Sequence, residues 1–500
     1  MKPILTTRRL MLAVGAAVVF LFFFFSFAFK PVRPLSAPAP PSPAPIVMAD
    51  DEYYQIPDGV GYAGQHMTNK AGLLTLTSEM GQNFYLVSDT ANNTGFLYAE
   101  VKADNYTPAG KPRLPLNISL VIDRSGSMEG AKLANVKKAA GFLVDRLNDK
   151  DMLSIVVYES NVGVLQKSVA VTDKKALHDI IDNIVTGGST NLGGGMMEGF
   201  NQVKKSYRSG YVNRVLLLSD GLANEGVTDL TVLANTAKKW FNTESISIST
   251  FGVGTDYNEN LMTKIAENGG GNYYYIKEPD QIPGILEKEV NGLLAVVAQQ
   301  AQLTFTLPAG VSIMRVYGGN YDMDKNQMTI NLKDIFANDT KAVLVKFKIK
   351  KGTNTDLAFA TRLSFNDATD NGTPKAIDNM NVMKPVTDRD LYLKNFSERV
   401  MQQCTMFESN DMLEKAMKAV DDRNYDKARK MGENTQGYTK SNMAKFASSK
   451  EMVMQDSVIS SYNSNLKDIE TKPDDQKNEM QKVSKLQNYY MRVKKVEEVK

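Results

Sequence analysis

The feature that most constrains the fold is a regular alternation of apolar strands and amphipathic helices between residues 116 and 276. The first unit is typical, because residues 116–122 form an apolar run of strand length and residues 132–147 carry one apolar helix face. Further expected strands are 152–158, 214–218, 246–253 and 273–276, and further expected helices are 174–184, 192–205, 230–241 and 259–268. Repeated units of this kind predict an α/β fold with a doubly wound, mostly parallel sheet.

Oxygen-bearing side chains stand where the strands of this sheet are expected to end. Asp123 and two serines follow the first strand, Thr190 lies in a glycine-rich loop before a helix, and Asp220 follows the strand at 214–218. Ligands of such sheets bind at the carboxyl ends of the strands. Two carboxylates with several hydroxyls suit an octahedral Mg²⁺ or Mn²⁺ that retains waters. A high-affinity Ca²⁺ site would need more carboxylates. The alternative for the first turn is a helix cap made by Asp and Ser.

These residues resemble the von Willebrand factor type A (vWA) domain with its metal-ion-dependent adhesion site. The D-x-S-x-S, threonine-loop and Asp-Gly elements are present in the family's order between residues 115 and 294. The resemblance implies a divalent metal, Mg²⁺ first with Mn²⁺ or Ca²⁺ as alternatives, and a protein partner that offers an Asp or Glu to it. The metal-coordinating positions correspond to Asp123, Ser125, Ser127, Thr190 and Asp220. A finer resemblance, to the bacterial and inter-alpha-trypsin-inhibitor/chloride-channel-like branch, rests on stretches 218–228, 251–257 and 270–276.

The N-terminal residues predict an anchor and a tether. Lys2, Arg8 and Arg9 precede an apolar run at residues 10–29, and about 20 helical residues span the roughly 30 Å hydrocarbon core of a bilayer. This run is longer than the apolar part of a cleaved secretory signal, so we expect a signal anchor or transmembrane helix over residues 1–30. The alternative is a cleaved signal and a secreted protein. Residues 31–50 are proline-rich and predict a stiff linker that holds the bulk of the chain on the periplasmic or extracellular side.

Strand-like segments flank the α/β region on both sides. We expect a β-rich flank at 51–112, the vWA domain at 113–294 and a β-rich domain at 295–386. Because neither flank is comfortably large alone, the hypothesis is that they combine into one β-sandwich into which the metal domain is inserted. Residues 387–500 predict a single helical hairpin followed by a charged, partly helical tail.

Composition narrows the function classes. The chain has 59 Lys+Arg and 56 Asp+Glu, a net charge of +3, which is too balanced to indicate a nucleic-acid binder. Cys404 is the single cysteine, and His66 and His178 are the two histidines, so zinc sites and Ser-His-Asp hydrolysis lack support. No nucleophile stands with a base. We therefore expect no catalytic residues, no small-molecule substrate and no enzyme activity.

Two functions remain at this point. The first is a membrane-tethered, metal-dependent protein-binding module that works in adhesion or assembly and captures an acidic residue of its partner. The second is a regulatory or recruiting subunit of an enzyme or a channel-like envelope complex, which rests on analogy alone.

Overall fold

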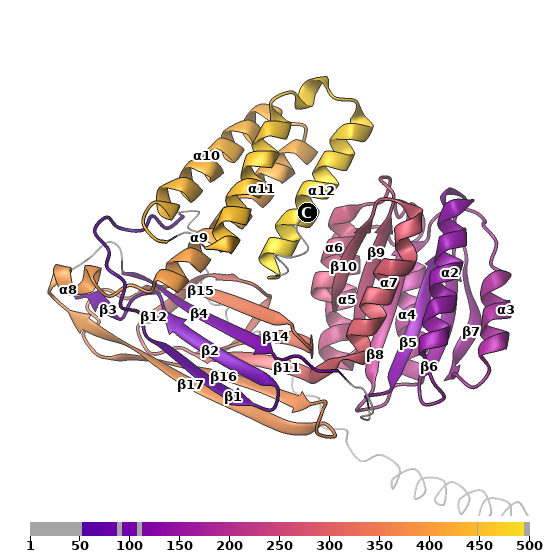
Figure 1. Cartoon of the computed structure of the whole chain (residues 1–500), viewed down its shortest axis with the longest axis horizontal. Helices are drawn as coiled ribbons and strands as arrows, with labels where there is room; N and C mark the ends of the chain where they lie inside the picture. Colours follow the sequence, from indigo (N-terminus) through magenta and orange to yellow (C-terminus); the bar gives the residue numbers. More distant parts are fainter. Residues whose placement is uncertain (1–52, 88–92, 108–112, 448, 495–500) are drawn as a thin grey trace, which may run out of the picture. The chain divides into compact units, whose positions relative to one another are not determined.

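The computed structural model describes residues 53–87, 93–107, 113–447 and 449–494 (Figure 1). The expected anchor at 1–30 and linker at 31–50 lie outside the described residues. Within the described ranges, no helix has both the length and the apolar character needed to cross a bilayer.

The α/β region is built on a six-stranded sheet with the order β10-β9-β8-β5-β6-β7. Every neighbouring pair is parallel except β6 and β7, which are antiparallel. Every residue of the central strands β5 and β8 is buried, as expected of strands covered on both faces. The predicted α/β class with a mostly parallel sheet is confirmed. The strands are β5 (Leu116–Asp123), β6 (Met152–Tyr158), β7 (Val162–Ala170), β8 (Val212–Ser219), β9 (Ser247–Val253) and β10 (Gly270–Ile276).

Helices cover both faces of this sheet (Figure 1). Along β5 the side chains alternate, so that Leu120 and Ile122 join the core under α2, α3 and α7, while Val121 joins the core under α4, α5 and α6. Strand β7 and helix α7 were absent from the sequence-based prediction, which assigned no element to residues 159–173 or 277–294. The helices are α2 (Ala131–Arg146), α3 (Lys174–Asp182), α4 (Leu192–Lys205), α5 (Leu230–Glu244), α6 (Glu259–Asn268) and α7 (Ile282–Leu294).

The two β-rich flanks interleave in two further sheets. Strand β4 from the first flank pairs antiparallel with β15 from the second, and β3 pairs parallel with β17. The two sheets share one apolar core that contains Leu76, Val101, Phe305 and Leu363. The first sheet has the order β1-β2-β4-β15-β12 and the second β13-β14-β11-β16-β17-β3. Their strands are β1 (His66–Ala71), β2 (Leu74–Met80), β3 (Phe84–Leu86), β4 (Thr94–Ala103), β11 (Val296–Thr306), β12 (Val311–Tyr317), β13 (Tyr321–Asp324), β14 (Gln327–Phe336), β15 (Thr340–Ile349), β16 (Leu357–Asp367) and β17 (Thr373–Val386).

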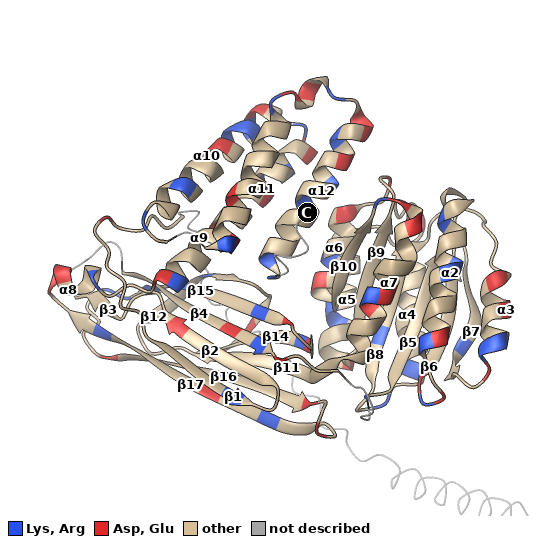
Figure 2. Ribbon diagram, viewed as in Figure 1, with Lys and Arg blue, Asp and Glu red and all other residues tan. Residues whose placement is uncertain are grey.

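The C-terminal region differs from the expected hairpin and charged tail. After the short α8 (Arg389–Leu393), the structure has four long helices, α9 (Glu398–Asp421), α10 (Tyr425–Met443), α11 (Lys450–Leu466) and α12 (Asp474–Arg492). Acidic and basic residues are interspersed along the last three (Figure 2). Helix α12 buries a largely polar face that includes Gln481, Lys482 and Asn488. The sequence analysis did not predict this buried face, because burial of polar side chains leaves no apolar periodicity to read.

Candidate metal centre

Three loops meet at the carboxyl ends of β5 and β8. Asp123 is the last residue of β5 and Asp220 follows β8, and these strands are parallel neighbours, so their ends lie at one edge of the sheet. The glycine loop is held to the first turn because the N–H of Gly187 donates to the carbonyl of Arg124 at 2.7 Å. A methyl group added at Gly221 would lie 3.1 Å from Oγ1 of Thr190, so the third loop touches the second.

Hydrogen bonds tie the predicted side chains together. Ser127 Oγ donates to Asp220 Oδ1 at 2.7 Å, and the Oγ atoms of Ser125 and Ser127 are 3.2 Å apart. Asp123 Oδ1 accepts the backbone N–H of Ser125 at 2.9 Å. The structure therefore brings the five predicted residues, Thr190 included, into one cluster. We call Asp123, Ser125, Ser127, Thr190 and Asp220 the metal cluster, and their role as ligands stays a prediction.

Burial makes the ionised form of the two carboxylates unfavourable. Asp123 and Asp220 are both 0% exposed, whereas Ser127 faces solvent at the mouth of the cluster. Burial raises the pKa of Asp123, hydrogen bonds from Ser125 and Ser219 offset part of that rise, and the carboxylate of Asp220 adds to it. Two buried like charges are stabilised by a cation. An ion bound here would be reached from solvent past Ser127.

The donor set fits a hard divalent ion. Among the described residues, no three His, Cys, Asp or Glu side chains are grouped to hold a metal, so a site made of carboxylates alone is absent there. The metal cluster instead combines two carboxylates with three hydroxyls, all of them hard oxygen donors. Mg²⁺ accepts such a set because it commonly keeps several waters and takes only one or two carboxylates.

The structure adds residues that the sequence analysis missed. Lys132 Nζ donates to Asp220 Oδ2 at 2.5 Å, Ser219 Oγ donates to Asp123 Oδ2 at 2.8 Å, and Asn224 Oδ1 accepts the N–H of Thr190 at 2.9 Å. Ser219 directly precedes Asp220, so its place beside the carboxylates follows from the sequence. Lys132 had no such signal, because a lysine in the first turn of a helix is ordinarily solvated.

Tight packing holds helix α4 against the sheet below the cluster. A methyl group added at Gly195 would lie 2.4 Å from Cδ1 of Tyr158, so a side chain there would clash with this fully buried ring. The Tyr158 hydroxyl donates to the carbonyl of Leu218 at 3.0 Å. This packing fixes the start of α4, which immediately follows the loop that carries Thr190. Gly195 of α4 therefore serves close packing.

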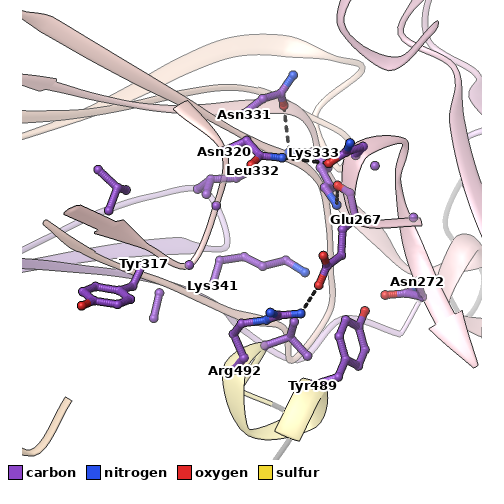
Figure 3. Close-up of a pocket in the computed structure, with 18 of the residues that line it drawn as sticks. Glu267, Asn272, Tyr317, Asn320, Asn331, Leu332, Lys333, Lys341, Tyr489 and Arg492 are labelled. Carbon is purple, nitrogen blue, oxygen red and sulfur yellow. Dashed lines mark hydrogen bonds and ion pairs between the residues drawn. The ribbon is translucent and has the colours of Figure 1, made fainter. Parts of the chain in front are cut away.

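A separate cavity of about 330 Å³ contains none of the metal-cluster residues (Figure 3). Its charged groups are engaged with one another. Arg492 pairs with Glu267 and lies 3.1 Å from Glu414, and Lys333 Nζ donates to the carbonyl of Glu267 at 3.0 Å. Figure 3 shows Arg492 directed at Glu267 across the cavity. The lining contains six basic and five acidic side chains, so its charges nearly balance.

Sequence relatives cover the region that contains the metal cluster. The family model for the von Willebrand factor type A domain matches residues 117–288. The Escherichia coli protein YfbK is 34% identical over 206 residues, which are 40% of this chain and 36% of YfbK. Inter-alpha-trypsin inhibitor heavy chain H3 of Homo sapiens is 23% identical over 326 residues, which are 63% of this chain and 34% of that protein. The chain thus spans about a third of the length of these relatives.

Solved structures share the fold over a larger part of the chain. A von Willebrand factor type A protein from Catenulispora acidiphila has a TM-score of 0.63 at 14% identity and covers 79% of this chain and 92% of its own. The ArnB paralog VWA2 from Sulfolobus acidocaldarius has a TM-score of 0.54 at 17% identity and covers 83% of this chain and 98% of its own. The chain therefore contains a von Willebrand factor type A domain, from a family of protein-interaction and adhesion modules.

Proposed function

We propose that this chain is a membrane-tethered protein-binding module whose metal cluster captures an acidic residue of a partner protein in adhesion or assembly. The observation that carries the proposal is the convergence of two fully buried carboxylates and three hydroxyls on a point that opens to solvent at Ser127. A divalent ion bound there would supply a positive charge with a coordination position left for a partner's Asp or Glu.

Residues of all three loops would contribute ligands to the ion. Asp123 and Asp220 would balance the charge of the ion, and Ser125, Ser127 and Thr190 would add neutral oxygens. The hydrogen bonds from Ser219 to Asp123 and from Ser127 to Asp220 hold the carboxylates in place before any ion arrives. This preorganisation lowers the cost of assembling the site when the ion and the partner bind.

The groups that would support catalysis stand elsewhere. His178 on α3 is 3.0 Å from Asp145, and Cys404 is buried in α9, where burial raises the pKa of its thiol. His66 is an exposed residue of β1. A nucleophile paired with a general base is therefore missing from the metal cluster, and the proposal is binding without chemistry.

Tethering by residues 10–29 is part of the proposal and rests on their apolar sequence. The full chain should sediment with membranes, and protease should reach residues beyond Pro31 from the non-cytoplasmic side. A mature N-terminus found between Lys30 and Asp50 would show that the segment is cleaved and would contradict the anchor.

The binding proposal is tested on the full chain in detergent by thermal melting with Mg²⁺, Mn²⁺ or chelator. The expected result is a higher melting temperature with either ion. In a pulldown, wild type should recover a partner protein in Mg²⁺, and this recovery should be lost in chelator. The exposed Asp145 provides a matched control, since Asp145→Ala should behave as wild type in both assays. Identical melting temperatures in Mg²⁺, Mn²⁺ and chelator would show that the proposed metal binding is wrong.

A further inference from the structure

Lys132 occupies an unusual place beside the metal cluster. It is the second residue of α2, and its ammonium lies 2.5 Å from Oδ2 of Asp220 while Ser127 uses the other oxygen, Oδ1. The Asp220 side chain is 0% exposed and that of Lys132 only 24%. On the far side, a methyl group added at Gly254 would lie 3.7 Å from Nζ, so the ammonium is confined between the β9 end and Asp220. The ion pair of Lys132 and Asp220 is therefore part of the packed structure around the metal cluster.

The ammonium changes the net charge of the cluster. Asp123, Asp220 and Lys132 together carry a net charge of −1. With a divalent ion they would carry +1, whereas the two carboxylates alone would be neutralised. At the rim, Arg124 and Glu159 form a pair at 3.4 Å and Glu129 is exposed to solvent, so these groups contribute less. The ammonium therefore opposes binding of a cation and leaves the loaded site positive.

We propose that Lys132 sets the metal affinity of the cluster, as an internal cation that holds Asp220 in the metal-free protein and weakens the affinity of the site for divalent ions. This inference rests on the proposed function, because it concerns the same ion. The resulting +1 charge of the loaded site favours an anionic group as the last ligand. A weakly held ion combined with this charge would make the partner's carboxylate an important part of a stable complex.

The test is isothermal titration of the full chain in detergent with Mg²⁺ and with Mn²⁺. Lys132→Met should bind either ion more tightly than wild type, by on the order of tenfold or more, since a positive charge is removed a few ångströms from the ion. Lys138→Met is the matched control, because Lys138 lies exposed on the same helix, and it should stay within about twofold of wild type. Lys132→Arg keeps the charge and should retain the weak affinity.

Melting in chelator separates this role from a structural one. Without metal, Lys132→Met leaves the buried Asp220 without its cation. The melting temperature of the variant should therefore fall below that of wild type. A residue that only supports the fold would, when replaced, lower both the stability and the metal affinity. Lys132 should instead show opposite signs, with lower stability in chelator and higher affinity for the ion.

The outcomes distinguish the two proposals. If wild type binds Mg²⁺ or Mn²⁺ and Lys132→Met binds it equally or more weakly, the role given to Lys132 is wrong. If neither protein binds either ion, the proposed metal function fails and this inference falls with it. Should Lys132→Met not fold, Lys132→Gln keeps a hydrogen-bond donor without the charge and should show the same tightening.

Discussion

Two clusters of charged side chains in the molecule are built on opposite principles. In the metal cluster there are two fully buried carboxylates but one ammonium, that of Lys132, which pairs with Asp220. The second group, here called the docking cluster, joins Glu259 of α6 to Lys482 and Lys485 of α12 and Asp421 of α9. Glu259 accepts from Lys482 at 2.7 Å and from Lys485 at 2.6 Å, and Lys485 also lies 2.7 Å from Asp421. The docking cluster has equal numbers of positive and negative groups, and the metal cluster does not.

The difference appears in the pKa values of the acidic side chains of the two clusters. Burial alone would raise the pKa of Glu259, but Lys485 and Lys482 outweigh it and lower the pKa to about 2. In the metal cluster, burial raises the pKa of Asp123 and its hydrogen bonds only partly compensate. A balanced cluster stabilises the fold as it stands, whereas an acid-rich cluster gains stability when a cation binds. The comparison separates a structural contact from a candidate binding site.

The largest expected effect is the loss of metal response in Asp123→Ala. At a Mg²⁺ concentration about a thousand times the dissociation constant, binding should stabilise wild type by about 4 kcal/mol, and the variant should lose this gain because a buried carboxylate ligand is gone. The measurement is denaturant unfolding with Mg²⁺ and with chelator. A full metal response in Asp123→Ala would mean that the ion binds elsewhere.

Breaking the docking cluster should destabilise the protein and leave the metal response intact. Lys482 is 3% exposed in its side chain, donates to the carbonyl of Tyr257 at 2.7 Å and lies 4.1 Å from the centre of its ring. Lys482→Met should therefore cost about 3 kcal/mol, since it removes one partner of a buried ion pair. The exposed Lys467 gives a control, and Lys467→Met should unfold like wild type. A changed affinity for Mg²⁺ in Lys482→Met would show that the two clusters are coupled.

Acid should act on the docking cluster through Glu259. Its pKa is lowered from 4.5 in the unfolded chain to about 2 in the fold, so its contribution to stability is complete above pH 4.5 and is lost as the pH falls toward 2. Between pH 6 and pH 3 the stability difference between wild type and Glu259→Gln should shrink by about 2 kcal/mol. Unfolding titrations of both proteins in chelator measure this difference. A constant difference would show that Glu259 is not held ionised by the lysines.

The smallest effect is expected for a hydroxyl of the metal cluster. Ser125→Ala should weaken Mg²⁺ binding by about tenfold, which is about 1.4 kcal/mol, because one neutral ligand is lost while both carboxylates remain. Ser189 is exposed in the same glycine loop as Thr190, so Ser189→Ala is the matched control and should bind Mg²⁺ as wild type. Titration calorimetry measures both. A loss as complete as that of Asp123→Ala would mean that Ser125 is needed to shape the turn itself.

The sequence predicted the α/β architecture because its signals are local. Apolar runs and helix faces repeat along residues 116–276, and Asp123 and Asp220 each stand at the end of such a run, so the sheet alone brings them to one edge. The same logic missed β7, which reverses direction after β6, and the packing of α12, whose buried face is largely polar. Both were missed because the evidence for them lies in what they contact.

The sequence by itself determined which side chains reach the mouth of the sheet, because strand ends and loops follow from periodicity. Only the tertiary structure decided which cation each acid meets. Lys132 and Lys482 are both lysines on helices, yet one lies against Asp220 beside a second buried carboxylate and the other joins Glu259 with Lys485. Charge balance depends on distances between segments far apart in the chain, and these distances are set by packing.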